Sequence, residues 1–300
     1  MIVPNPDAYG TYAAASALAD YLELLSLHGH SLTKATLGDV IADSGWRVRR
    51  QENIAAPETD EEEFDASEDR VYSLIRERRR VLGQQYPFVE DGAGRLTHLN
   101  GQVGQPYRAL LAITLVHAYR VPAPRDPKHV LEQTVADVLA ARGWLSLNFG
   151  ALSRIGGFAA AVAASGGPLQ LATDPAGAPH PSAAQDEGVD TLAHIPWCGA
   201  RSGRWVVVGQ VTCAVSNVWR RKILEPSPAS WMRFLADIVP PVSFLAVPHH
   251  AEPQHRIYVM VQSGRLLLDR LSLVRHKAAT TADEDSLIET VLAFGVERPT

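Results

Sequence analysis

The sequence predicts an α+β protein, with a mostly helical domain at residues 1–125 and an α/β domain with a mixed central sheet at residues 126–300. Three observations support this prediction. Apolar residues recur at helical spacing through much of the first domain. The segment 121–127 (VPAPRDP) holds three prolines, which is typical of a boundary between domains. After it, a helix, strands, a second helix and more strands follow one another, as in a sheet covered by helices.

The first domain is expected to contain four helices and one hairpin. Its third helix begins with acidic and ends with basic residues, which suits the helix dipole. Two short apolar runs flank the turn DGAG at 91–94 and predict a β-hairpin. The predicted helices cover 1–30, Thr33–Ser44, Ser67–Leu82 and Tyr107–Tyr119, and the predicted hairpin strands are Tyr86–Val89 and Leu96–Leu99.

The second domain is expected to alternate helices with strands. Residues 172–185 (ATDPAGAPHPSAAQ) predict a flexible loop, because proline, alanine and glycine dominate them. The predicted helices are Lys128–Arg142, Phe158–Ala164, 217–224, 228–238 and Asp285–Phe294. The predicted strands are 190–195, 204–212, 242–247, 256–261 and 265–273.

Charge is unevenly distributed along the chain. The net charge of −5 argues against a globally basic protein that wraps nucleic acid. Most of the excess acid lies in a predicted loop at 51–69, where eight of the twelve residues Glu58–Asp69 are acidic. The second domain is close to neutral, so its composition does not exclude an anionic ligand.

Cysteine content and hydropathy indicate a cytoplasmic protein with no membrane partner. The two cysteines, Cys198 and Cys213, are too few for a disulfide framework and lack metal-ligand spacing. The sequence has no basic and apolar leader, and no run of eighteen apolar residues.

Two polar residues stand at the ends of neighbouring predicted strands. Asp190 closes the acidic turn DEGVD (186–190) and enters one strand, whereas Gln210 lies near the end of the apolar run VVVGQVT (206–212). Carboxylate and amide oxygens are ligands that Mg²⁺ accepts. A solvated turn and a hydrogen-bonded core glutamine are the alternative readings of the two residues.

Two further residues complete a candidate catalytic set. Glu132 lies on the helix that opens the second domain, and Lys222 lies on the helix after the second strand. We expect Asp190, Gln210 and Glu132 to hold Mg²⁺ or Mn²⁺, and Lys222 to orient or deprotonate the attacking water. An exposed helix residue and a solvated basic face are the alternatives for Glu132 and Lys222. The neighbouring Arg220 and Arg221 are candidate contacts to nucleic-acid phosphates.

This ordered set resembles the PD-(D/E)xK nuclease superfamily, which has the restriction-endonuclease-like fold. The resemblance covers about residues 126–273, and its turn and glutamine-containing strand are most similar to the Mrr-like branch and to restriction-like proteins of bacterial antiphage defence. It implies a metal-dependent endonuclease that hydrolyses phosphodiester bonds of DNA, with DNA a better candidate than RNA. It also implies possible protein partners in a defence complex, with a homodimer as one arrangement. The first domain would then regulate the nuclease or recognise a partner.

One residue departs from the superfamily pattern. The strand lysine expected two residues after Gln210 is Thr212 here, so catalysis would require Lys222 to replace it. The alternative is a catalytically inactive restriction-like subunit that binds nucleic acid or partner proteins. A third reading is an α+β interaction protein with an acidic regulatory loop.

Overall fold

Strand β5 (Trp205–Val211) lies at the centre of a five-stranded mixed sheet in the order β3-β4-β5-β6-β7. Strand β4 runs antiparallel to both of its neighbours, β3 and β5, whereas β6 and β7 continue the sheet parallel to β5. The mixed central sheet predicted for residues 126–300 is therefore confirmed. The other four strands are β3 (Leu145–Asn148), β4 (Thr191–Ile195), β6 (Val242–Ala246) and β7 (Leu266–Leu268).

The computed structural model describes residues 1–44, 68–99, 101, 104–176, 188–196, 203–236 and 238–297. Most of the acidic loop predicted at 51–69, and Asp186 and Glu187 of the DEGVD turn, lie outside the described residues. The loop predicted at 172–185 is described only as far as residue 176.

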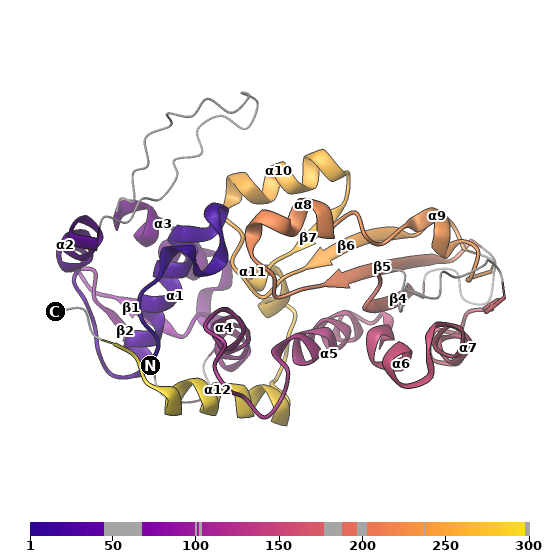
Figure 1. Cartoon of the computed structure of the whole chain (residues 1–300), viewed down its shortest axis with the longest axis horizontal. Coiled ribbons are helices and arrows are strands. Elements are labelled where there is room, and N and C mark those ends of the chain that lie inside the picture. Colours follow the sequence, from indigo (N-terminus) through magenta and orange to yellow (C-terminus); the bar gives the residue numbers. More distant parts are fainter. Residues whose placement is uncertain are drawn as a thin grey trace.

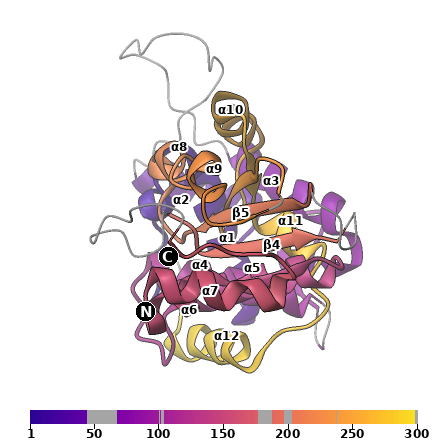
Figure 2. The same ribbon diagram turned by 90° about the vertical axis from the view of Figure 1, so that its right-hand side faces the viewer.

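Helices cover both faces of the sheet (Figure 1). Helices α8, α9 and α10 lie on one side, and α5, α6 and α7 lie on the other, as Figure 2 also shows along a second direction. These helices are α5 (Pro127–Ala141), α6 (Phe149–Gly156), α7 (Phe158–Leu169), α8 (Trp219–Lys222), α9 (Pro228–Trp231) and α10 (Pro253–Ser263). The short helix α11 (Arg270–Val274) follows β7.

The prediction of a strand at 256–261 is wrong, because these residues form part of helix α10. Its β-branched and aromatic residues favour a strand, but β6 and β7 are parallel and need a crossover between them. A helix starting at Pro253 supplies it, with His255 and Val259 buried one turn apart. The strand predicted at 265–273 is also shorter than expected, since only Leu266–Leu268 pairs with β6.

Residues 145–156 form two elements that the sequence pattern did not predict. Strand β3 is half-buried throughout, so it lacks the apolar alternation that marks a strand. Helix α6 follows directly and is capped by the Asn148 side chain, which accepts a hydrogen bond from the Ala151 backbone at 2.9 Å. The helix predicted at 228–238 is likewise only one turn long, ending at Trp231.

The segment 1–125 contains the predicted helices, and the predicted hairpin is confirmed. Its elements are α1 (Ala14–Leu27), α2 (Lys34–Ser44), α3 (Glu68–Leu82), β1 (Phe88–Glu90), β2 (Leu96–His98) and α4 (Gln105–Ala118). Two short 3-10 turns at Pro6–Tyr9 and Thr11–Ala13 precede α1, where one long helix was expected.

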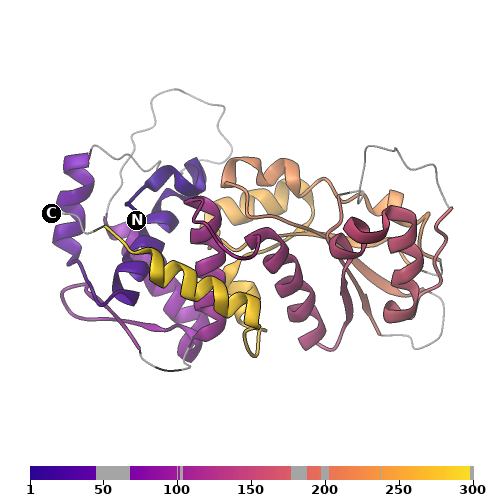
Figure 3. The same ribbon diagram turned by 60° about the horizontal axis from the view of Figure 1, so that its bottom comes forward.

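The last helix packs against helices from the N-terminal half of the chain. Helix α12 (Ala282–Phe294) packs mainly on α4, and Figure 3 shows it running along the helical end of the molecule. Ile2 and Val296 form an isolated parallel bridge, so residues near both ends of the chain lie side by side. The largest apolar core is continuous from α1 through α4 and α5 to β5 and β6.

A buried network of charges joins α1 and α3 to α11, which follows the last strand of the sheet. The guanidinium of Arg270, at the start of α11, donates to both carboxylate oxygens of Asp20 at 2.7 and 2.6 Å. Arg78 of α3 contacts Asp20 at 2.7 Å and Glu23 at 2.8 Å. All four side chains are inaccessible to solvent. Because a buried charge must be paired, each of these residues requires the others.

Tyrosine hydroxyls complete the network. The Tyr9 hydroxyl donates to Asp20 at 2.7 Å, and the Tyr86 and Tyr107 hydroxyls donate to Glu23 at 2.6 and 2.8 Å. Burial would raise the pKa of Asp20, but the guanidinium groups of Arg270 and Arg78 lower it to about 2. The carboxylate therefore stays ionised inside the protein.

Replacing Arg270 with methionine should lower the free energy of unfolding by about 3–5 kcal/mol, because Asp20 loses its bidentate partner while still buried. Urea unfolding followed by circular dichroism measures this. The matched control is Arg125→Met, since Arg125 pairs with Asp283 at 3.2 Å and both side chains are more than half exposed. Arg125→Met should lower the free energy of unfolding by at most about 1 kcal/mol. Equal losses in the two variants would contradict a central role for the Asp20–Arg270 pair.

Stability should fall in two steps as the pH is lowered. Burial lowers the pKa of His249 and His255 from 6.5 to about 4, so the unfolded chain binds protons first. Protonation of each histidine should lower the free energy of unfolding by about 3 kcal/mol between pH 6.5 and 4. Asp20, with its pKa lowered from 3.8 to about 2, should lose its contribution between those two values.

Urea unfolding at a series of pH values checks this dependence. His255→Phe should flatten the curve between pH 6.5 and 4, because a phenyl ring keeps the stacking on Tyr12 and Trp219 without a titratable group. His129→Phe, at an exposed position, should leave the slope unchanged. An unaltered slope in His255→Phe would disprove the assignment to His255.

Candidate active site

Asp190 is fixed in place immediately before β4 by the backbones of two neighbouring elements. Its carboxylate Oδ2 accepts a hydrogen bond from the Val211 backbone at the end of β5, at 2.8 Å. Its own backbone donates to Gly209 at 2.8 Å and accepts from Gly150 in α6 at 3.0 Å. The side chain is buried. The predicted acid therefore stands where the start of β4, the end of β5 and the start of α6 meet.

Glu132 reaches the same point from helix α5. It is fully buried, and its Oε2 accepts a hydrogen bond from the Arg154 guanidinium of α6 at 2.6 Å. The ammonium of Lys128, one turn earlier on α5, lies 3.4 Å from Glu132 Oε1 and 3.5 Å from Asp190 Oδ1. Lys128 thus bridges the two carboxylates, and its side chain is 40% exposed while both carboxylates are buried.

Gly150 shows how closely the two acids converge. A Cβ atom at this position would lie 3.2 Å from Glu132 Oε2 and 3.3 Å from Asp190 Oδ1. The carboxylates therefore occupy the space beside the first turn of α6, where a side chain would otherwise stand. The positive end of that helix favours negative charge beside it.

Gln210 lies next to this cluster but on another face of β5. Side chains alternate along a strand, so Gln210 shares a face with Val206 and Val208 and is paired with Leu245 of β6. Val207 and Val211, on the other face, pack in the core that includes α5. The amide Oε1 of Gln210 is buried and has no hydrogen-bond partner among the described residues. No contact between this amide and Asp190 or Glu132 is seen in the described part of the chain.

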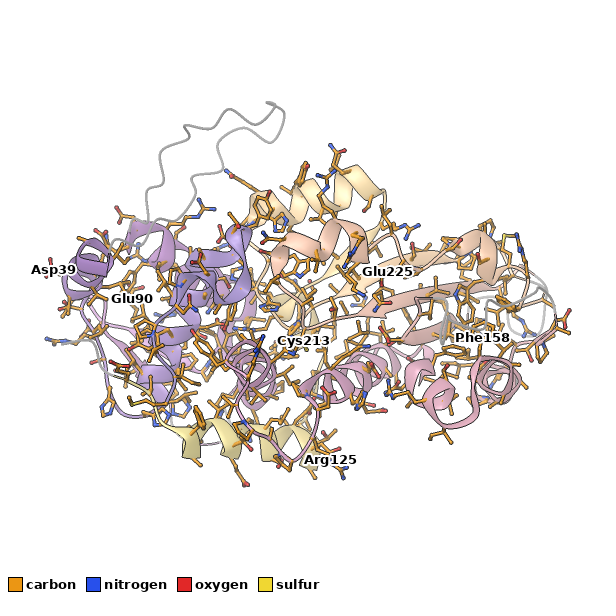
Figure 4. All side chains as sticks on the ribbon, viewed as in Figure 1. Asp39, Glu90, Arg125, Phe158, Cys213 and Glu225 are labelled. Carbon is orange, nitrogen blue, oxygen red and sulfur yellow. The ribbon has the colours of Figure 1, made fainter. Side chains whose placement is uncertain are left out.

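Lys222 forms an ion pair with a neighbouring residue and not with Asp190 or Glu132. Its ammonium donates to the Glu225 carboxylate at 2.8 Å, and Glu225 lies on the α8 side of the sheet (Figure 4). Arg220 stacks over the Tyr258 ring at 4.9 Å, and Arg221 is exposed. The structure thus brings Asp190 and Glu132 together, with Lys128 between them where we had expected Lys222.

Thr212, which occupies the expected lysine position, makes a local bond instead. Its hydroxyl accepts a hydrogen bond from the Ala214 backbone at 3.1 Å and so shapes the turn after β5. The residue is buried. The turn then leads past Cys213 (Figure 4), whose buried thiol has its pKa raised by burial.

Two residues of the cluster were missed in the sequence. Lys128 stands four residues before Glu132, a spacing that puts both on one face of a helix, and this signal could have identified it. Arg154 gave no such signal, because α6 itself was not predicted.

The oxygen donors present are compatible with a hard divalent cation. Asp190 and Glu132 supply two carboxylates, and Mg²⁺ usually keeps several waters when one or two carboxylates hold it. A group of three or more acidic, histidine or cysteine side chains at metal-binding distances is not found in the described ranges. Any such site would therefore depend on the two carboxylates and on other oxygen ligands.

Comparison with protein-family models, with curated proteins and with solved structures gives no match to this chain. No helix in the described segments combines the length and the apolarity needed to cross a membrane.

Proposed function

We propose that this protein is a metal-dependent nuclease of the restriction-endonuclease-like kind, which hydrolyses phosphodiester bonds of DNA in bacterial restriction or antiphage defence. The observation that carries the proposal is the meeting of Asp190, Glu132 and Lys128 at the adjoining ends of β4 and β5. Two buried carboxylates with a solvent-facing ammonium can serve metal-assisted hydrolysis of a phosphodiester.

Each residue of the cluster would have a separate role in hydrolysis. Asp190 and Glu132 would hold Mg²⁺ or Mn²⁺, which when bound lowers the pKa of a water and offsets phosphate charge. Lys128 would contact the substrate phosphate or the attacking water, because its ammonium lies within 3.5 Å of both carboxylates and its side chain is 40% exposed. Arg154 would keep Glu132 oriented. Gln210 would have no direct role at this cluster, because its side chain lies on the other face of β5.

The order of elements along the chain also supports the proposal. An acid on helix α5, an acid at the start of β4, an amide near the end of β5 and a basic helix α8 follow one another, as the resemblance to the PD-(D/E)xK superfamily implies. The exposed Arg220 and Arg221 on α8 would contact DNA phosphates beyond the cleavage site.

A catalytically inactive subunit is the second candidate, and one observation favours it. Lys128 and Arg154 already balance the charges of both carboxylates, as in a purely structural ion cluster. Such a chain would bind nucleic acid or partner proteins without cutting. It would show no cleavage with Mg²⁺ or Mn²⁺, and its DNA binding would survive Asp190→Asn.

Asp190→Asn should reduce Mg²⁺-dependent cleavage of DNA by at least about a hundredfold, because it removes a ligand charge while an oxygen remains for the Val211 N–H. Gel assays on supercoiled and linear DNA measure the loss, and a thermal melt checks folding. Asp174→Asn, at an exposed carboxylate whose oxygen accepts from the Ala176 backbone, is the control and should cut normally. Undiminished cleavage by Asp190→Asn would disprove this site.

Lys128→Met should lower the cleavage rate by about a hundredfold, a typical effect of removing a group that assists proton transfer. Lys222→Met should change it by less than about threefold, because Lys222 is held in a partly exposed pair with Glu225. Single-turnover rates with saturating Mg²⁺ distinguish the two. The opposite ranking would place the catalytic lysine on α8.

A further inference from the structure

A cavity of about 450 Å³ lies beside helices α3, α10 and α11. It is lined by residues of α3, α10 and α11, by Leu268 of β7 and by Arg142, which follows the last residue of α5. Its volume falls in the range of sites for small molecules. Three arginines line it: Arg142, Arg256 and Arg275.

None of these three arginines pairs with a carboxylate among the described residues. Arg142 lies over the Trp144 ring at 5.7 Å and contacts His276, which also lines the cavity. The Nε of Arg256 is buried and has no hydrogen-bond partner in the described part of the chain. This Nε is out of reach of a ligand, so it is through its terminal nitrogens that Arg256, which lines the cavity, would bond an acceptor from outside the chain.

The two carboxylates at the cavity are occupied by other groups. Glu77 lies 3.6 Å from Nε2 of the buried His250. Asp269 caps α11 by accepting hydrogen bonds from the Ser272 backbone at 3.0 Å and from the Ser272 hydroxyl at 2.8 Å. Its second oxygen accepts from the Ala251 backbone at 3.3 Å. Three positive charges therefore face the cavity against two acids that are already bonded.

We propose that this cavity binds a phosphorylated small molecule. Guanidinium groups present forked donors that match phosphate oxygens, and three of them surround one space. The wall also has apolar residues, among them Leu268, Leu271 and the exposed Ile257, which suit a ring or other apolar part of the same ligand. A nucleoside monophosphate has both features.

The cavity is independent of the proposed nuclease centre. Arg142 follows the last residue of α5, whereas Lys128 stands in its first turn. A helix of 15 residues is about 22 Å long, so the two sites lie at opposite ends of it. Failure of one proposal leaves the other intact, and Asp190→Asn should bind the phosphate ligand as the native chain does.

Calorimetric titration of the full chain with AMP, with inorganic phosphate and with adenosine tests the proposal. AMP should bind at one saturable site, phosphate more weakly, and adenosine weakest. Arg256→Gln and Arg275→Gln should each weaken AMP binding by about tenfold, because each loses charge-assisted hydrogen bonds. Arg233→Gln, which removes an exposed arginine outside the cavity, should not change it.

Three outcomes would overturn the proposal. The first is no saturable binding of AMP or phosphate at constant ionic strength. The second is equal weakening in Arg233→Gln, which would indicate general electrostatic attraction. The third is binding of a short DNA duplex that needs Arg256 and Arg275 while AMP does not bind, which would make the arginines a nucleic-acid surface. If the glutamine variants melt early, Arg275→Lys keeps the charge but removes the fork, and it should still weaken AMP binding.

Discussion

The packing of the N-terminal helices against the sheet depends on the bidentate ion pair between Asp20 and Arg270. Asp20 lies within α1 and Arg270 begins α11 directly after β7, and neither side chain reaches water. An ionised pair in such surroundings is tolerated only when every charge is matched and hydrogen-bonded, which Arg78 and Tyr9 accomplish for Asp20. Separating α1 from the sheet would leave these charges unpaired away from solvent. The paired charges therefore add a geometric constraint to the apolar packing that already links α1 to the sheet.

Much of the architecture could be predicted from the sequence, and the exceptions have physical causes. Helices α1 to α5 and α12 show apolar spacing, and strands β4, β5 and β6 are apolar runs, so their patterns are local. Helix α10 was misread because its β-branched residues favour a strand, while the parallel pairing of β6 with β7 requires a crossover helix. Strand β3 is half-buried and lacks a periodic signal. The Asp20–Arg270 pair joins residues 250 positions apart, which no local pattern can reveal.

The candidate site, too, could be predicted from the sequence only where the signal is local. Asp190 and Glu132 could be selected because acids near strand and helix ends are visible in the sequence, and the fold brings them together through Lys128. Lys222 was selected by its place on the next helix, but that helix is one turn long and its lysine meets Glu225 three residues later. The ion pair with Glu225 competes with any contact between Lys222 and the more distant Asp190. The arginine-lined cavity could not be foreseen, because its three arginines come from separate elements.

The β-bridge between Ile2 and Val296 has a consequence for folding. Helix α1 needs Arg270, and α4 needs α12, so the N-terminal helices cannot reach their final packing until almost the whole sequence has been synthesised. Contacts of such long range slow folding and leave apolar surface exposed meanwhile. During translation, the helical half is therefore expected to wait in a partly folded state, when molecular chaperones would have their greatest effect on yield.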